Sequence, residues 1–353
     1  MNNLSAVLLA FSWAFVIQKL ILIVIIVSVS LVIAMYETYL ERKVASWMQD
    51  RIGPNRAGPF GILQPLADGT KLFFKEEIIP NTSNKVLFVL GPGLAMLAAL
   101  MTCAVVPWGS HLQIGDTTIP LQIADVNIGI LYVFGVVSLG VYGIMIGGWA
   151  SNNKFSLLAA LRGASQAISY ELAMGISLIA LLFISGDLSM KTIVEKQMAS
   201  GVWNVVYQPL GFLIFLVCAF AECNRTPFDL PEAESELNMG YHQEYSSMKL
   251  GFYLFAEYIN MFISSAVMAT LFFGGYDIPF LDESKHDPNL MAVLGLVALM
   301  AKIIFFIFLF MWVRWTVPRF RYDQLMNLGW KKLLPLALVN MLVTAAVILA
   351  FQK

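Results

Sequence analysis

Long apolar runs, separated by short segments that carry most of the charge, dominate the chain. An α-helix needs about 20 apolar residues to cross the roughly 30 Å hydrocarbon core of a bilayer. Eight runs reach about this length, at residues 4–36, 86–106, 126–150, 163–185, 202–221, 250–275, 290–313 and 334–351. Because eight such runs are too many to bury in a soluble chain of this length, the pattern predicts an all-α polytopic membrane protein: a single membrane domain with eight transmembrane helices.

A shorter amphipathic segment follows the first run. Between Phe60 and Glu77, polar and apolar residues recur with a helical period. One face carries Gln64, Asp68, Lys71 and Lys75, and another carries Ile62, Leu66 and Phe73. The pattern predicts a helix that lies in the membrane surface, and an ordinary amphipathic connector would show the same period.

The basic residues are distributed unequally between the two sides of the predicted bundle. Sixteen of the 22 Lys and Arg residues fall in the loops after the first, third, fifth and seventh predicted helices. By the positive-inside rule these loops face the cytoplasm, so both termini are expected on the periplasmic side of a bacterial inner membrane. The predicted functional loops are the cytoplasmic segments 41–85 and 222–249.

Composition narrows the possible cofactors and partners. A net charge of -1 provides no basic field that would attract nucleic acid. The three cysteines form no Cys-x-x-Cys pair and the three histidines are scattered, so we expect no iron–sulfur cluster, zinc ion or haem in this chain. Any redox cofactors of a reaction that the chain serves would therefore lie in other chains.

Ionisable residues within the predicted spans are the sharpest candidates for function, because a charge at the bilayer centre costs about 2.5–3.5 kcal/mol on insertion scales. Glu171 and Glu257 are the clearest cases. The sixth predicted helix carries a polar stripe made of Tyr253, Glu257, Asn260 and Ser264, which suits a hydrated proton path. Glu37 and Glu222 end their runs near the cytoplasmic surface, where each could also be a solvated helix end.

The segment 222–249 is acidic on an otherwise basic side. Its acids outnumber Arg225 and Lys249; they are Glu222, Asp229, Glu232, Glu234, Glu236 and Glu244. The alternation of the three glutamates at 232, 234 and 236 brings like charges together, which is expected to raise some of their pKa values. Carboxyls poised near neutral pH can accept and return protons. A solvated acidic face that binds a basic partner is the alternative.

The segments 41–58 and 221–237 resemble the two signatures of the NADH-quinone oxidoreductase subunit 1 family, whose bacterial members are called H subunits. They read ERKVASWMQDRIGPNRAG and AECNRTPFDLPEAESEL. The resemblance extends through 64–80 and 240–249, and the eight predicted spans agree with the family fold. Cys223 and Ser247 stand where many members have Thr and Gly, and neither change removes an ionisable group that the family uses.

The resemblance implies a membrane subunit of proton-pumping respiratory complex I, at the junction with its hydrophilic arm. Quinone would be the substrate, reached through a chamber expected to include Glu37, Arg42, Arg51, Asp68, Phe228, Glu232, Glu234 and Glu236. A proton path would include Glu171, Glu222, Tyr253 and Glu257. The chain itself would bind no cofactor, and FMN and iron–sulfur clusters would lie in partner subunits.

The resemblance also implies which partner subunits to expect. They are the quinone-site and iron–sulfur subunits of the hydrophilic arm, small membrane-arm subunits, antiporter-like subunits and membrane lipid. Two alternatives remain open: a homologous subunit of a membrane-bound hydrogenase, and a stand-alone proton-coupled transporter. The segments 51–56, 60–77 and 222–249 favour the quinone enzyme, and the sequence shows no inverted repeat of the kind common in transporters.

Overall fold

The computed structural model describes residues 13–351 except 115–116, 280 and 282–286, and it leaves out the side chains at 13–14, 114, 117 and 234–235. The start of the first predicted run, 4–12, lies outside the described residues. Within them, seven segments are long and apolar enough to cross a membrane. They are α2 (Trp13–Met48), α4 (Lys85–Thr102), α5 (Gly129–Ala150), α6 (Lys154–Ser185), α11 (Ser247–Phe272), α12 (Pro288–Thr316) and the continuous segment Tyr322–Phe351.

The remaining predicted span, 202–221, contains two shorter helices. These are α8 (Asn204–Tyr207) and α9 (Pro209–Glu222). With 14 residues, α9 is shorter than the roughly 20 residues that a helix needs to cross the hydrocarbon core. The all-α polytopic fold class is thus confirmed, whereas the count of eight spans stays a prediction.

Two predicted helices have different bounds in the structure. The fourth predicted span starts nine residues earlier than its apolar run, because α6 begins at Lys154, where the Asn153 side chain accepts a hydrogen bond from the Phe155 amide at 3.0 Å and caps the first turn. The amphipathic segment forms a short turn, η1 (Pro59–Gly61), and then α3 (Gln64–Phe74). Its position in the membrane surface stays a prediction.

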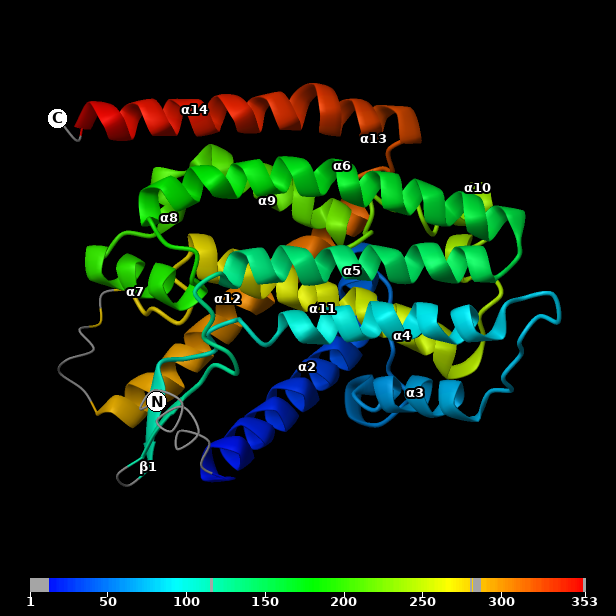
Figure 1. The fold of residues 1–353 in the computed structure, drawn as a ribbon. Coiled ribbons are helices and arrows are strands. Elements are labelled where there is room, and N and C mark those ends of the chain that lie inside the picture. The colour runs from blue at the N-terminus through cyan, green and yellow to red at the C-terminus, as the bar shows by residue number, and fades with distance from the viewer. Residues whose placement is uncertain (1–12, 115–116, 280, 282–286, 352–353) are drawn as a thin grey trace, which may run out of the picture.

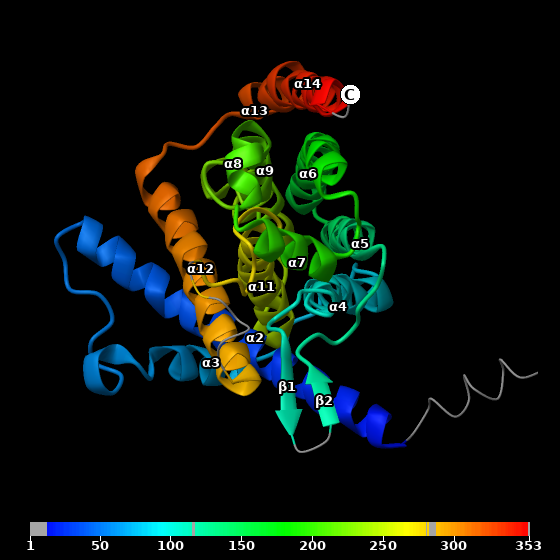
Figure 2. The same ribbon diagram turned by 90° about the vertical axis from the view of Figure 1, so that its left-hand side faces the viewer.

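Helix α11 occupies the centre of the bundle. In its most apolar 18-residue window, 72% of the residues are buried, against 11% for α2. It packs against α4, α12 and α2, and against α9 near its middle. Figures 1 and 2 show α11 surrounded by these helices. The final segment, α13 (Tyr322–Leu328), a π-helical turn η4 (Gly329–Leu333) and α14 (Leu334–Phe351), forms an outer layer over α6 and α9.

Small residues let α4 and α5 approach each other closely. A side chain at Gly143 would come within 2.7 Å of the Ala95 amide nitrogen and 2.9 Å of the Gly91 carbonyl oxygen. One turn along α5, a side chain at Gly147 would meet the Tyr253 hydroxyl at 1.8 Å. This small-xxx-small packing therefore leaves room for an α11 side chain at the α4–α5 seam.

The bundle has two chemically different ends. The end called here the α3 end holds α3, the loops after α2, α5, α9 and α12, and the short helices α10 (Glu234–Leu237) and η2 (Gly240–His242). The opposite end, called the α7 end, holds α7 (Met190–Ser200), α8 and an antiparallel hairpin of β1 (His111–Ile114) and β2 (Thr117–Pro120). In Figure 1 the α3 end lies to the right, and α7 and α8 lie to the left.

Candidate functional site

Arg225 is the centre of a buried charged cluster at the α3 end. Helix α9 stops at Glu222, and Asn224 takes a left-handed conformation that turns the chain back, so the Arg225 amide donates to the Phe220 carbonyl. The guanidinium is 6% exposed and lies over the Tyr258 ring at 4.2 Å. Its nitrogens stand 3.5 Å from a Glu41 oxygen and 3.9 Å from a Glu257 oxygen. Arg225 thus lies between a carboxylate of α2 and a carboxylate of α11.

Glu41 connects three helices to the loop that carries Arg225. Its side chain, only 8% exposed, also forms an ion pair with Arg314 of α12. The Tyr258 hydroxyl donates a hydrogen bond to the same carboxylate at 2.9 Å. Because a buried charge is costly without partners, these contacts fix the relative positions of α2, α11 and α12 at this end.

Glu257 is joined to the acidic loop. The Tyr241 hydroxyl donates to Glu257 Oε1 at 3.0 Å, and the Glu257 and Glu232 carboxyl groups share a hydrogen bond. A hydrogen bond between two carboxyl groups requires a proton on one of them. Glu232 and Glu257 therefore form a pair that can hold one proton between the loop and the buried helix.

The pKa values in the acidic loop differ from the sequence expectation. Burial acts to raise the pKa of Glu232, but the hydrogen bond with Glu257 and the nearby charges of His242 and Arg225 lower it below its ordinary value. Burial and the charge of Glu232 raise the pKa of Asp229 to about 7, against the opposing effect of Arg319. The sequence predicts a raised pKa for some of the three glutamates at 232, 234 and 236, and Glu232 is not one of them, because its spatial neighbours differ from its neighbours in sequence.

A cavity extends from this cluster along α11. Its lining residues include Tyr241, Tyr253, Glu257, Asn260 and Glu222. The Tyr253 hydroxyl donates to the Gly143 carbonyl at 3.1 Å. The structure therefore brings three of the four predicted proton-path residues to one cavity.

The fourth of these residues, Glu171 of α6, does not line this cavity. It accepts a hydrogen bond from the Ser138 hydroxyl of α5 at 3.0 Å, and the charges of Glu171 and Glu222 interact. Glu37 is one turn before Glu41 on α2, and 1% of its surface is exposed. No described side chain donates a hydrogen bond to its carboxylate, while Arg225 and Glu41 are its charged neighbours.

The predicted chamber residues fall into separate groups. Arg42 and Asp68 form an ion pair of 2.7 Å between α2 and α3, and the exposed Arg51 follows the end of α2. Glu37 and Glu232 belong to the Arg225 cluster.

The other predicted chamber residues contact a different part of the bundle. Glu236 pairs with Arg162 of α6 at 2.6 Å. Phe228 packs in the core between the rings of Tyr170 and Phe320. The side chain of Glu234 lies outside the described residues. The contacts of Phe228 and Glu236 therefore place them on the α6 side rather than at the junction of α2 and α3.

Five residues of the cluster were absent from the sites predicted from sequence: Arg225, Glu41, Arg314, Tyr241 and Tyr258. The sequence contains a signal for two of them. Glu41 follows Glu37 by one helical turn, and Arg225 is one of two cations in an acidic segment. Burial of both residues arises from tertiary packing, which the local pattern does not contain. Among the described residues, no group of three or more His, Cys, Asp or Glu side chains could hold a metal ion.

Comparison with known proteins identifies the family. The family described as NADH dehydrogenase matches residues 20–345. The chain is 64% identical over 337 residues to the NADH-quinone oxidoreductase H subunit 1 of Cytophaga hutchinsonii, and the match covers 96% of this chain and 98% of the relative. This chain belongs to the NADH dehydrogenase family.

More distant members of the NADH dehydrogenase family agree over almost the whole chain. The NADH-quinone oxidoreductase H subunit of Flavobacterium johnsoniae is 62% identical, covering 95% of this chain and 96% of the relative. The H subunit 1 of Geobacter metallireducens is 47% identical, covering 93% and 95%. The resemblance to the bacterial H subunits is confirmed, and the chain is a membrane subunit of NADH-quinone oxidoreductase, respiratory complex I. The hydrogenase and transporter alternatives are not favoured.

Proposed function

We propose that this subunit couples the reduction of quinone at its α3 end to proton movement through its buried carboxylates. The observation that carries the proposal is the unbroken series from the acidic loop to the bundle interior. Glu232 is hydrogen bonded to Glu257, Glu257 and Glu222 line one cavity, and Glu222 interacts with Glu171. Carboxyl groups that share protons and cavities are suited to proton transfer.

The orientation follows from the basic residues. Most of the Lys and Arg residues lie at the α3 end, in its loops and in the helix turns beside them, so we expect this end to face the cytoplasm. Both termini are then periplasmic, in a bacterial inner membrane. The α3 end would contact the quinone-site and iron–sulfur subunits of the hydrophilic arm, which hold the FMN and the clusters, while small membrane-arm and antiporter-like subunits and lipid would border the helices.

The quinone chamber would open at the junction of α2 and α3. The Arg42–Asp68 pair holds this junction, and the Gln64 amide donates to Asp68 at 3.0 Å. Behind it lie Glu37 and the Arg225 cluster. Asp68→Ala should therefore raise the KM for quinone in assembled complex, with Asp323→Ala, a change at an exposed acid of α13, as the matched control. Unchanged quinone kinetics would remove the junction from the chamber.

Arg225 would transmit the change of charge in the chamber. Its distances to Glu41 and Glu257, 3.5 and 3.9 Å, both exceed the 2.7–3.2 Å range of a close N–H···O hydrogen bond. A negative charge near Glu232 or Asp229 would favour protonation of these acids and alter the balance between the two carboxylates that Arg225 faces. Once Glu232 has taken up a proton of its own from the cytoplasmic side, the proton that it had shared with Glu257 would be released toward Glu222 and Glu171.

The test is Glu257→Gln in the assembled complex, with Glu195→Gln on the exposed face of α7 as the control. Glutamine keeps an oxygen for the Tyr241 hydroxyl but carries no exchangeable carboxyl proton. We expect quinone reduction and proton pumping by vesicles to fall at least about tenfold, as for loss of a general acid–base group. Pumping and reduction at wild-type rates would contradict the proposed role of Glu257.

A further inference from the structure

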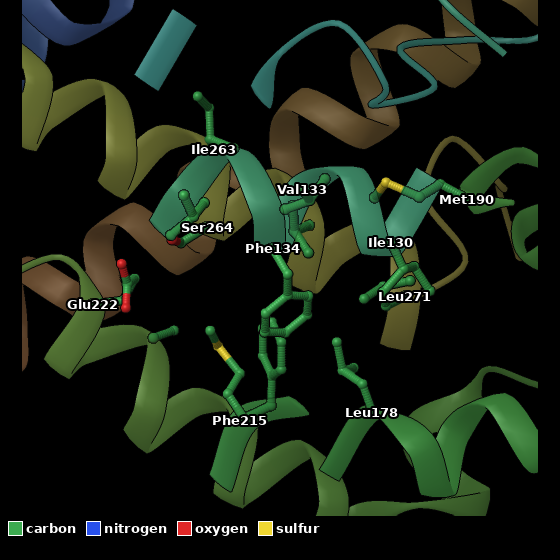
Figure 3. Close-up of a pocket in the computed structure, with 14 residues that line it drawn as sticks. Ile130, Val133, Phe134, Leu178, Met190, Phe215, Glu222, Ile263, Ser264 and Leu271 are labelled. Atoms are coloured by element: carbon green, nitrogen blue, oxygen red, sulfur yellow. The ribbon is translucent and has the colours of Figure 1, made fainter. Parts of the chain in front are cut away.

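A second cavity lies on the α7 side of Glu222, and its walls are apolar. It lies between α5, α6, α9 and α11. Its polar lining consists of Glu222 and Ser264, and the other lining residues are aliphatic, aromatic or methionine. Figure 3 shows Glu222 and Ser264 on one side and Leu271, Ile130 and Met190 on the other.

Glu222 stands at the boundary between the two cavities. It lines the polar cavity together with Glu257 and Tyr253, and it lines the apolar cavity together with Ser264. Val137 of α5 also borders both. A proton on Glu222 thus faces hydrogen-bonding groups toward the α3 end and hydrocarbon toward the α7 end.

The apolar lining is long enough to block proton transfer through it. From Ser264 to Leu271 the seven-residue rise along α11 is about 10 Å at 1.5 Å per residue. A water chain across this length needs 2–4 polar partners for each water, and the described lining offers none between Ser264 and the outer wall. Apolar constrictions of this kind block conduction because water is unfavourable in them.

The outer wall of this cavity is held in place by hydrogen bonds. The Gln197 amide of α7 donates to the carbonyls of Thr270 and Leu271, and its oxygen accepts from the amides of Asn204 and Gly274. The Asn204 side chain donates to the Leu271 carbonyl at 2.9 Å. These bonds satisfy the last carbonyls of α11 and fix α7, with Met190, across the cavity end.

We infer that Val133, Phe134, Leu178, Ile263, Val267 and Leu271 form an apolar plug that separates Glu222 from the α7 surface and prevents protons from leaking through this protein. The plug gives proton transfer its direction, because a proton on Glu222 can move only toward Glu257 or Glu171. This inference rests on the proposed function, since a barrier beside Glu222 matters only if Glu222 carries protons.

The test adds hydroxyl groups to two plug residues and to Val137 beside them, without changing the volume of the side chains greatly. The triple variant Val133→Thr, Val137→Thr and Val267→Thr places three hydroxyls along the cavity lining. The matched control makes the same change at three exposed positions, Val293, Val297 and Val339. Purified complex is reconstituted in liposomes, and the decay of an imposed pH gradient is measured without NADH.

We expect the gradient to decay about tenfold faster in the plug variant, the factor expected from about one hydrogen bond's stabilisation of entering water, and at the wild-type rate in the control. Adding Glu222→Gln to the triple variant should restore slow decay. Slow decay in an assembled triple variant would overturn the inference, and so would fast decay that persists with Glu222→Gln. If the triple variant does not assemble, Val267→Thr alone decides the same question with a smaller effect.

The leak experiment also separates the plug from the proposed function. Wild-type NADH-driven pumping by the Glu222→Gln single variant would contradict the role of Glu222 in coupling. Because the leak is measured without turnover, the decay rates test the plug independently of this pumping result.

Discussion

The two halves of the bundle bury different side chains on the same helices. Toward the α3 end, α2 and α11 bury Glu41, Glu257 and Tyr258 around Arg225. Toward the α7 end, α11 buries Ile263, Val267 and Leu271 beside a cavity with almost no polar lining. Glu222 marks the boundary. The polar stripe of α11 ends at Ser264, and in our proposal the apolar half beyond it insulates Glu222.

Removing Arg225 should have the largest effect on the charged half. Arg225→Ala leaves Glu41 and Glu257 buried with one fewer cation, and loss of one partner of a buried ion pair costs about 3–5 kcal/mol. We expect little assembled complex in membranes, measured by immunoblot and by NADH-quinone activity. Arg225→Lys keeps the charge and should assemble better. Equal assembly of the alanine variant and wild type would show that the cluster does not stabilise this end.

Asp229 should make the stability of the charged half depend on pH. Its folded pKa is raised from 3.8 to about 7, chiefly by burial, so the folded chain binds this proton more tightly than the unfolded chain does. The stabilisation is complete below the unfolded pKa and is lost as pH rises through about 7. Asp229→Asn should remove this loss, a gain of at most about 4 kcal/mol at pH 8.

The measurement for Asp229 is the Tm of the solubilised complex between pH 5 and pH 8. Wild type should lose stability over this window more steeply than Asp229→Asn does. The control, Asp323→Asn, changes an acid whose side chain is 65% exposed and should follow wild type. Parallel curves for all three proteins would mean that Asp229 does not titrate in this range.

The α4–α5 seam tests how closely Tyr253 must be held. In Gly147→Ala the new methyl group would lie 1.8 Å from the Tyr253 hydroxyl, so the ring must move away from residue 147, which disturbs its hydrogen bond to the Gly143 carbonyl. Overpacking of this kind costs about 1–3 kcal/mol, and proton pumping should fall with it. Gly135→Ala on the same helix meets no atom within 4 Å and should behave as wild type in thermal denaturation and pumping assays.

Ser138 is expected to give the smallest effect. Its hydroxyl donates to Glu171 at 3.0 Å, and loss of one such hydrogen bond in Ser138→Ala costs about 1 kcal/mol. The pH profile of pumping should shift slightly, because the Glu171 carboxylate loses its hydrogen-bond donor. Ser138→Thr keeps the hydroxyl and should restore the wild-type profile. Identical profiles for alanine and wild type would show that Ser138 does not position Glu171.

The fold could be predicted from the sequence where apolar runs are long. Charge-free stretches indicated the helices because the bilayer requires about 20 apolar residues. Such stretches do not reveal the first turns of α6, where Lys154 and Arg162 interrupt the run but Asn153 caps the helix. They also overestimate the run at 202–221, which the structure divides at Gln208 into α8 and α9.

The site was predictable where a charge lies inside a span. Glu171 and Glu257 were selected as candidates because both interrupt apolar runs, and Glu257 is buried in the structure. Arg225 and Glu41 lie at helix ends, where charged residues are ordinary, and only the folding of the loop onto α11 buries them. The pKa of Glu232 could not be deduced from sequence for the same reason, since its decisive neighbours, Glu257, His242 and Arg225, are distant from it along the chain.

The most direct measurement of coupling through the buried carboxylates is infrared difference spectroscopy of the assembled complex during quinone reduction. We predict a change in the carboxyl bands of protonated glutamate in wild type and in Glu195→Gln, and its loss in Glu257→Gln. Such a result would show that the proton on the Glu232–Glu257 pair moves when quinone is reduced. The same carboxyl bands in Glu257→Gln and wild type would contradict the proposed coupling.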